Sequence, residues 1–338
     1  MKLRTELEVG RAGRLLNPEE SVVLIGSCFT DSVGQRMRSH CWRAYPNPTG
    51  VLYNPASIAS ALRLTLSDEA ERERLLHESI ASRDLGKDAR LWSCWHFDSG
   101  CSSFSESETL ERGLGMVREL EKQLREASVL IFTFGTAWVY ELVSRPGFIV
   151  GNCHKFPASD FRRRRLSIDG IVGEWSGLIE ELRRRYGDKR IIFTVSPIRH
   201  LKDGFEGNTR SKAVLQLSCE AIVEECGNTE YFPAYELLND DLRDYRFYAS
   251  DLVHPSEEAV EYIWEKFCDR YLSAESRQLL SEAARLRRAL LHKPNLACGG
   301  QIYERLESSR LSQARQNLAA FLKRHPGMTA NLSFDGSC

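Results

Sequence analysis

The stretch SVVLI at residues 21–25, followed directly by GSCFT at residues 26–30, decides the predicted fold. A short apolar, mostly β-branched run ended by glycine predicts a strand that is buried on both faces, as in a parallel sheet. Helical spacing follows from Asp31, so GSCFT is predicted to form a strand-to-helix turn. In an open parallel sheet such turns lie at the carboxyl edge, where ligands bind. Ser27 is therefore a candidate site residue, although it could also simply cap the helix.

Further strands and helices alternate along the chain. Buried strands are expected at residues 129–134 and 191–195, and a weaker one at 230–235. Amphipathic helices are expected at residues 55–66, 108–126, 174–186, 211–225 and 256–271. This alternation predicts βαβ units and a mostly parallel sheet of about five strands, with helices on both faces.

Two regions depart from the alternation. Residues 67–107 are polar and irregular, which predicts an insertion or a lid. From Ser273 only helical periodicity remains, so we expect an α/β domain over residues 1–272, a helical extension over 273–325 and a tail over 326–338. The extension is predicted to pack on the α/β body or on a partner subunit, including a second copy of the chain.

The composition excludes several classes of function. The 338 residues include 46 basic and 47 acidic side chains, and a net charge of −1 supplies no field that would attract nucleic acid. Hydrophobic residues make up 42%, which is too many for a disordered chain, and no apolar run is long enough to span a membrane. The 10 cysteines form no CxxC pair, and the first residues contain no apolar h-region, so we expect no secretory signal. We expect a cytoplasmic enzyme.

A second motif, Asp251-Leu252-Val253-His254-Pro255, precedes the helix expected at 256–271. The spacing allows the Asp251 carboxylate to reach Nδ1 of His254, which leaves Nε2 free to take a proton from a nucleophile. Taken alone, the motif could also be a helix cap or half of a metal site.

Together the two motifs resemble the SGNH (GDSL-like) hydrolase superfamily, and more closely the GSCFA domain family, with Thr30 in place of the usual Ala. The resemblance covers about residues 20–270. Its further motifs are Asn47-Pro48-Thr49-Gly50, Tyr53-Asn54-Pro55, Thr133 to Trp138, Asn152 to Lys155, Thr194 to His200, Ser211-Lys212, Tyr231 to Glu236 and Asp244 to Tyr248. It implies a flavodoxin-like three-layer sandwich, with Ser27 as nucleophile, His254 as general base and Asp251 as its orienting partner.

The resemblance also implies an oxyanion hole built from the amides of Ser27 and a glycine, for which Gly50 is the candidate. The superfamily usually adds an Asn from a Gly-x-Asn-Asp turn, but here that turn reads Gly-Thr-Ala-Trp at residues 135–138. A replacement donor is expected from a separate set of candidates: Asn54, Asn152 and His154.

Other polar residues have open roles. His200 follows a predicted strand, so it could bind substrate or relay a proton, or simply bond to a loop carbonyl. Arg199 could hold an anionic substrate group. Arg162 to Arg165 could also attract an acidic substrate, but they are interpreted as a solvated loop. Cys28 is a rival nucleophile, but its side chain is expected to point toward the sheet or helix. The Cys94/His96 and Cys153/His154 pairs match no standard zinc spacing.

Three functions remain open from the sequence. The first is a cofactor-free serine esterase or O-acyltransferase that acts on an ester, such as an acylated carbohydrate, through a Ser27 acyl-enzyme. The second is a catalytically silent binding or scaffold protein on the same fold. The third is a metal-dependent hydrolase built on Asp251, His254, His200 and His154.

Overall fold

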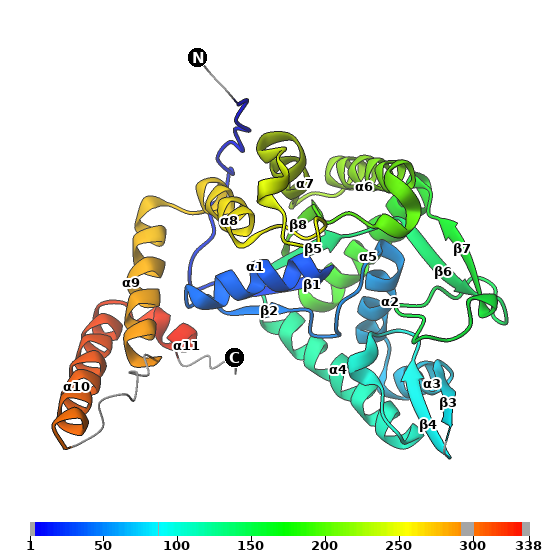
Figure 1. Ribbon diagram of the computed structural model, residues 1–338, viewed down its shortest axis with the longest axis horizontal. Coiled ribbons are helices and arrows are strands. Elements are labelled where there is room, and N and C mark those ends of the chain that lie inside the picture. Colours follow the sequence, from blue (N-terminus) through cyan, green and yellow to red (C-terminus); the bar gives the residue numbers. More distant parts are fainter. Residues whose placement is uncertain (1–3, 87, 292–300, 333–338) are drawn as a thin grey trace.

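The structure is a computed structural model that describes residues 4–86, 88–291 and 301–332. Its central feature is a five-stranded parallel sheet (Figure 1). Its order is β2-β1-β5-β8-β9. The strands are β1 Val22–Gly26, β2 Ala44–Pro46, β5 Val129–Phe134, β8 Arg190–Val195 and β9 Thr229–Tyr231. Counted along the chain this order is 2-1-3-4-5, which is the flavodoxin-like order. The predicted flavodoxin-like sandwich is confirmed, although the last strand is shorter than expected.

Helices cover both faces of the sheet. One face packs against α2 Pro55–Leu66, α4 Glu106–Glu126, α5 Ile168–Tyr186 and α6 Gly204–Glu225. The other packs against α1 Cys28–Ser39, α7 Ala234–Glu236 and α8 Glu257–Tyr271. Successive strand residues serve opposite faces, since Leu130 and Phe132 join the first core while Val129 and Ile131 join the second. Burial on both faces is why the strands are continuously apolar.

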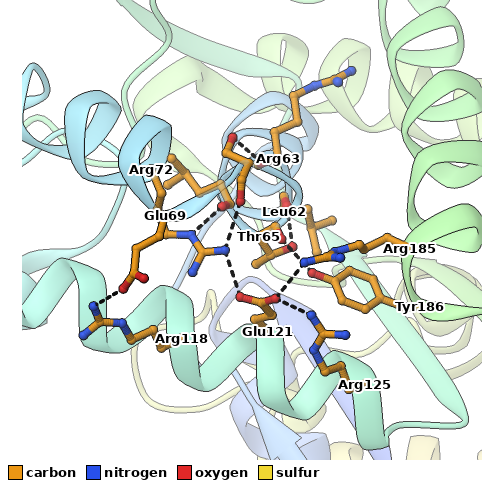
Figure 2. Close-up of polar contacts among 12 residues, drawn as sticks. Leu62, Arg63, Thr65, Glu69, Arg72, Arg118, Glu121, Arg125, Arg185 and Tyr186 are labelled. Carbon is orange, nitrogen blue, oxygen red and sulfur yellow. Dashed lines mark hydrogen bonds and ion pairs between the residues drawn. The ribbon is translucent and has the colours of Figure 1, made fainter.

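The segment at residues 67–107, predicted to be irregular, contains regular structure. It forms α3 Glu69–His77 and an antiparallel hairpin of β3 Ile80–Gly86 and β4 Ala89–Cys94. A charged contact fastens α3 to the body, because Arg72 donates to Glu121 of α4 at 2.8 Å (Figure 2). Glu121 also accepts from Arg125 of its own helix at 2.6 Å. Leu76 of α3 is buried in the first core, but the helix shows little apolar periodicity, so its sequence pattern did not reveal it.

A second hairpin corrects the interpretation of the arginine run as a solvated loop. Residues Phe161–Arg165 form β7, which pairs antiparallel with β6 Trp138–Leu142. Side chains alternate along the strand. Arg162 and Arg164 both donate to Glu141, at 2.6 and 2.7 Å, whereas Arg163 forms an ion pair with Asp203.

The C-terminal helices are present as predicted: α9 Ala274–Leu291, α10 Gln301–Arg324 and the short α11 Thr329–Leu332 (Figure 1). Leu280, Ala283 and Phe321 belong to the same core as α1 and α8, so the extension packs on the α/β body. The predicted tail differs over residues 326–332, where Met328 is fully buried and Asn331 donates to the Pro18 carbonyl at 2.6 Å. The remainder of the predicted tail, residues 333–338, lies outside the described residues. Within residues 4–86, 88–291 and 301–332, no helix is both long and apolar enough to cross a membrane.

Candidate functional site

A cavity of about 380 Å³ opens at the carboxyl edge of the sheet. The turn after β1 supplies Cys28, the segment after β5 supplies Thr136, and the segment after β8 supplies His200. His254, from the turn before α8, completes this side of the wall. Strand order reverses between β1 and β5, which is where ligand crevices form in open α/β sheets.

The turn at residues 251–254 holds an oriented imidazole. One oxygen of Asp251, Oδ1, accepts from the amides of Val253 and His254 at 2.9 and 3.0 Å, and Oδ2 lies 2.6 Å from His254 Nδ1. These backbone amides, more than the imidazole, lower the pKa of Asp251 to about 2. The carboxylate is therefore ionised at neutral pH and directs His254 Nε2 away from itself. The contact expected from the spacing of the two residues is present.

The atom that meets His254 Nε2 is the sulfur of Cys28, at 3.6 Å. The expectation that Cys28 packs toward the sheet or helix is met in part, because Cys28 packs against the second core but also lines the cavity. The Ser27 hydroxyl is buried and has no hydrogen-bond partner among the described residues, so Ser27 occupies the N-cap position of α1 without a side-chain cap and forms no hydrogen bond with the imidazole. Ser27 is extended, with ψ of 172°, and Cys28 begins the helix. This change of backbone direction is what separates the two side chains.

The environment of the Cys28 sulfur contains opposing influences. Burial raises the pKa of the Cys28 thiol, whereas the backbone amides of Cys28 and Phe29, at the start of α1, lower it. Burial is the larger effect, so the resting sulfur carries its proton and needs a base to become a nucleophile. His254 Nε2 is in the position to be that base.

The residues predicted for the oxyanion hole fall into two groups. The Ser27 amide donates to the Thr133 carbonyl at 3.3 Å, and the Gly50 amide donates to the Asn47 carbonyl at 2.9 Å. His154 is also engaged elsewhere, since its Nε2 lies 2.9 Å from the Cys94 carbonyl oxygen. These three groups are therefore occupied by contacts within the fold.

Asn54 and Asn152, by contrast, both line the cavity. Asn54 Oδ1 accepts from the Ser57 amide at 2.8 Å and so caps α2. Asn152 Oδ1 accepts from the His154 amide at 2.8 Å. Fixing each oxygen leaves the NH₂ group of the same side chain for the cavity. Asn54 is the better placed donor, because its cap fixes it to a helix.

His200 lines the same cavity and is half-buried. Its Nε2 has no hydrogen-bond partner in the described part of the chain, and it lies close to the backbone of Gly135. Burial, and then the nearby charge of Lys212, lowers the pKa of His200 to about 4. The ring is therefore neutral at neutral pH, and its Nε2 is itself buried.

Lys212 of α6 was named only as part of a family motif, and no role was predicted for it. Its fully buried ammonium donates to the carbonyls of Gly135 and Ser196, both at 2.6 Å, and so joins the segments that follow β5 and β8. A signal was present, because Lys212 falls on the buried helical stripe with Leu215 and Cys219. Burial lowers the pKa of Lys212 to about 7.

The buried Lys212 makes the stability of the protein depend on pH in the alkaline range. Its pKa is lowered from 10.5 to about 7 on folding, so between these values the unfolded chain binds more protons and the free energy of unfolding rises with pH. From pH 7 to 9 the rise from this group is about 2 kcal/mol. We expect urea unfolding of Lys212→Met and Lys212→Gln to lack that increment, while the exposed-site control Lys122→Met keeps it. An unchanged pH dependence in both variants would contradict the assignment.

In the ranges that the structure describes, no three His, Cys, Asp or Glu side chains gather to hold one ion. Of the four residues in the metal-hydrolase hypothesis, His154 faces Cys94 rather than the cavity.

Fold and site together define a flavodoxin-like α/β protein. At the carboxyl edge of its sheet the Cys28 sulfur contacts the His254 imidazole, which in turn contacts the Asp251 carboxylate. The sequence model of the GSCFA family matches residues 21–267, which is well over half of the chain. The protein belongs to the GSCFA family, as its motifs predicted. No curated protein sequence matches the chain.

Proposed function

We propose that the protein is a cysteine-dependent acyl-transfer enzyme, an esterase or O-acyltransferase, with Cys28 as nucleophile, His254 as base and Asp251 as its orienting partner. The observation that carries the proposal is the 3.6 Å contact of Cys28 Sγ with His254 Nε2, joined to the 2.6 Å contact of His254 Nδ1 with Asp251. This is the arrangement that activates a thiol by an adjacent oriented base. Cys28 thus takes the role of nucleophile that was predicted for its neighbour Ser27.

The reaction follows from the positions of these atoms. His254 Nε2 takes the thiol proton as the Cys28 sulfur attacks the ester carbonyl, and the carbonyl oxygen becomes an oxyanion. Collapse of this intermediate breaks the ester C–O bond, and His254 returns the proton to the departing alcohol, which leaves a thioester on Cys28. Water, or an acceptor hydroxyl, then loses its proton to His254 and attacks the thioester carbonyl. Collapse of this second intermediate breaks the C–S bond, and His254 returns the proton to the Cys28 sulfur. The products are an acid or a new ester and the free thiol.

A burst experiment tests this proposal. Mixing the protein with excess 4-nitrophenyl acetate should release about one equivalent of nitrophenol per chain before slower steady turnover, because acyl-enzyme forms before it is hydrolysed. His254→Ala and Asp251→Asn should both reduce the burst rate. Equal rates in wild type and in both variants would contradict the proposal and favour a catalytically silent protein.

The side-chain NH₂ group of Asn54 is expected to donate a hydrogen bond to the oxyanion. Asn54→Asp keeps the oxygen that caps α2 but removes the NH₂ group, so helix stability should change little while kcat falls by about 10²- to 10³-fold. Asn152→Asp is the matched variant at the other amide of the cavity. Steady-state kinetics, with urea unfolding to check stability, measure both effects. A kcat for Asn54→Asp within a few-fold of wild type would remove Asn54 from the oxyanion hole.

A further inference from the structure

The charges that line the cavity are not balanced, and we propose that the site acts on substrates that carry an anionic group, a carboxylate or a phosphate, which Arg199 and Lys202 bind. This inference rests on the proposed function, since it names the substrate class of the same site. Of the described residues that line the cavity, three are Arg or Lys and one, Asp203, is acidic.

Asp203 is already neutralised within the fold. It forms an ion pair with Arg163 of β7, whose guanidinium also lies over the ring of Trp138, 4.8 Å from its centroid. Arg163 and Asp203 therefore act as a balanced pair in the wall. Neither Arg199 nor Lys202 pairs with a carboxylate anywhere in the described ranges, so two cationic groups remain for a ligand.

Arg199 is held without being neutralised. Its guanidinium lies over the rings of Tyr248 and Phe205, 5.4 and 5.9 Å from their centroids, and it also donates a long 3.5 Å hydrogen bond to Asn239 Oδ1. Aromatic faces attract the cation but leave its charge in place. A guanidinium fixed in this way presents a planar fork that fits a carboxylate or a phosphate.

Lys202 lies on the same wall. Its ammonium donates to the Tyr140 hydroxyl at 2.6 Å and lies 5.0 Å from the centroid of that ring. An ammonium has three donors, so two remain for a ligand oxygen. Together with Tyr53 and Trp138, Tyr140 supplies an apolar aromatic surface for the uncharged part of a substrate. The cavity thus combines an acyl-transfer end at Cys28 with a cationic wall.

A pair of nearly isosteric esters tests the inference. We expect wild-type kcat/KM for 4-nitrophenyl hemisuccinate to exceed that for 4-nitrophenyl butyrate by at least about tenfold, as a charged hydrogen bond would give. Arg199→Gln and Lys202→Gln should each lower the value for the hemisuccinate by about 10- to 100-fold and change the butyrate value by less than about threefold. Lys122→Gln, which removes the same charge from an exposed position on α4, should change neither. Inhibition by phenyl phosphate compared with phenyl succinate separates a phosphate from a carboxylate preference.

A binding measurement separates this inference from the proposed function. Titration calorimetry with succinanilic acid and the neutral butyranilide needs no turnover. Tighter binding of the acid to wild type, lost in Arg199→Gln, supports the anion site even if neither ester is hydrolysed. Equal affinity for the two amides, or equal losses for both esters in the variants, would overturn it.

Discussion

Replacing Cys28 by alanine is expected to lower kcat/KM for ester hydrolysis by about 10³- to 10⁶-fold, the range found when a nucleophile of a catalytic triad is removed. Ser27→Ala should lower it by less than about tenfold, because the Ser27 hydroxyl is buried, has no partner in the described residues and does not line the cavity. The two positions are adjacent, so this pair of variants separates the rival nucleophiles with the same backbone around each.

The large effect expected for Cys28→Ala depends on the distance from the Cys28 sulfur to His254 and on the protonation state of the thiol. Cys28 Sγ lies 3.6 Å from His254 Nε2, within reach of a proton transfer, and burial keeps the thiol protonated until that transfer occurs. Cys28→Ser is the conservative variant, and it should retain activity between those of wild type and Cys28→Ala. A Ser27→Ala variant that loses activity as completely as Cys28→Ala, while its urea unfolding curve stays unchanged, would reverse the assignment.

Gly26→Ala is expected to prevent folding or to destabilise the protein by at least about 4 kcal/mol. A Cβ at residue 26 would lie 2.3 Å from the Thr133 carbonyl oxygen and 2.8 Å from Thr133 Cβ, on the strand paired with β1. Backbone cannot move aside as a flexible side chain could, so β1 and β5 would have to separate where the site begins. Circular dichroism and urea unfolding measure the loss.

Gly173 offers the matched control for that substitution. It lies inside α5, and a Cβ there would meet nothing within 4 Å. Gly173→Ala should therefore stabilise the protein by about 0.5 to 1 kcal/mol, through helix propensity alone. A Gly26→Ala protein as stable as wild type would contradict the close approach of β1 and β5.

The sequence predicted the sheet and most of the helices because their signals are local. The helix at 55–66 has the bounds expected for it, since Asn54 caps it and Pro55 occupies its first position. The short strand β2 and helix α3 were not predicted. A three-residue strand shows no periodicity, and α3 is fastened by charged contacts such as Arg72 to Glu121.

The candidate site was predicted in part. The Asp251–His254 contact follows from a spacing of three residues within one turn, so the sequence encodes it directly. Which of two consecutive side chains enters the cavity depends on the angle between strand and helix, which spacing does not record. Cys28 could therefore not be preferred to Ser27 from its position alone. Lys212 was quoted as part of a motif but given no role, because a lysine is usually assigned to the surface even on an apolar helical stripe.

The most direct test of the central claim is the identity of the acylated residue. The protein is mixed briefly with 4-nitrophenyl acetate, quenched in acid, digested and analysed by peptide mass spectrometry, with Cys28→Ala and Ser27→Ala treated in parallel. We expect an acetyl group on Cys28 that neutral hydroxylamine removes, as it does from thioesters, and that is absent from Cys28→Ala. An acetyl group on Ser27 that resists neutral hydroxylamine would contradict this expectation.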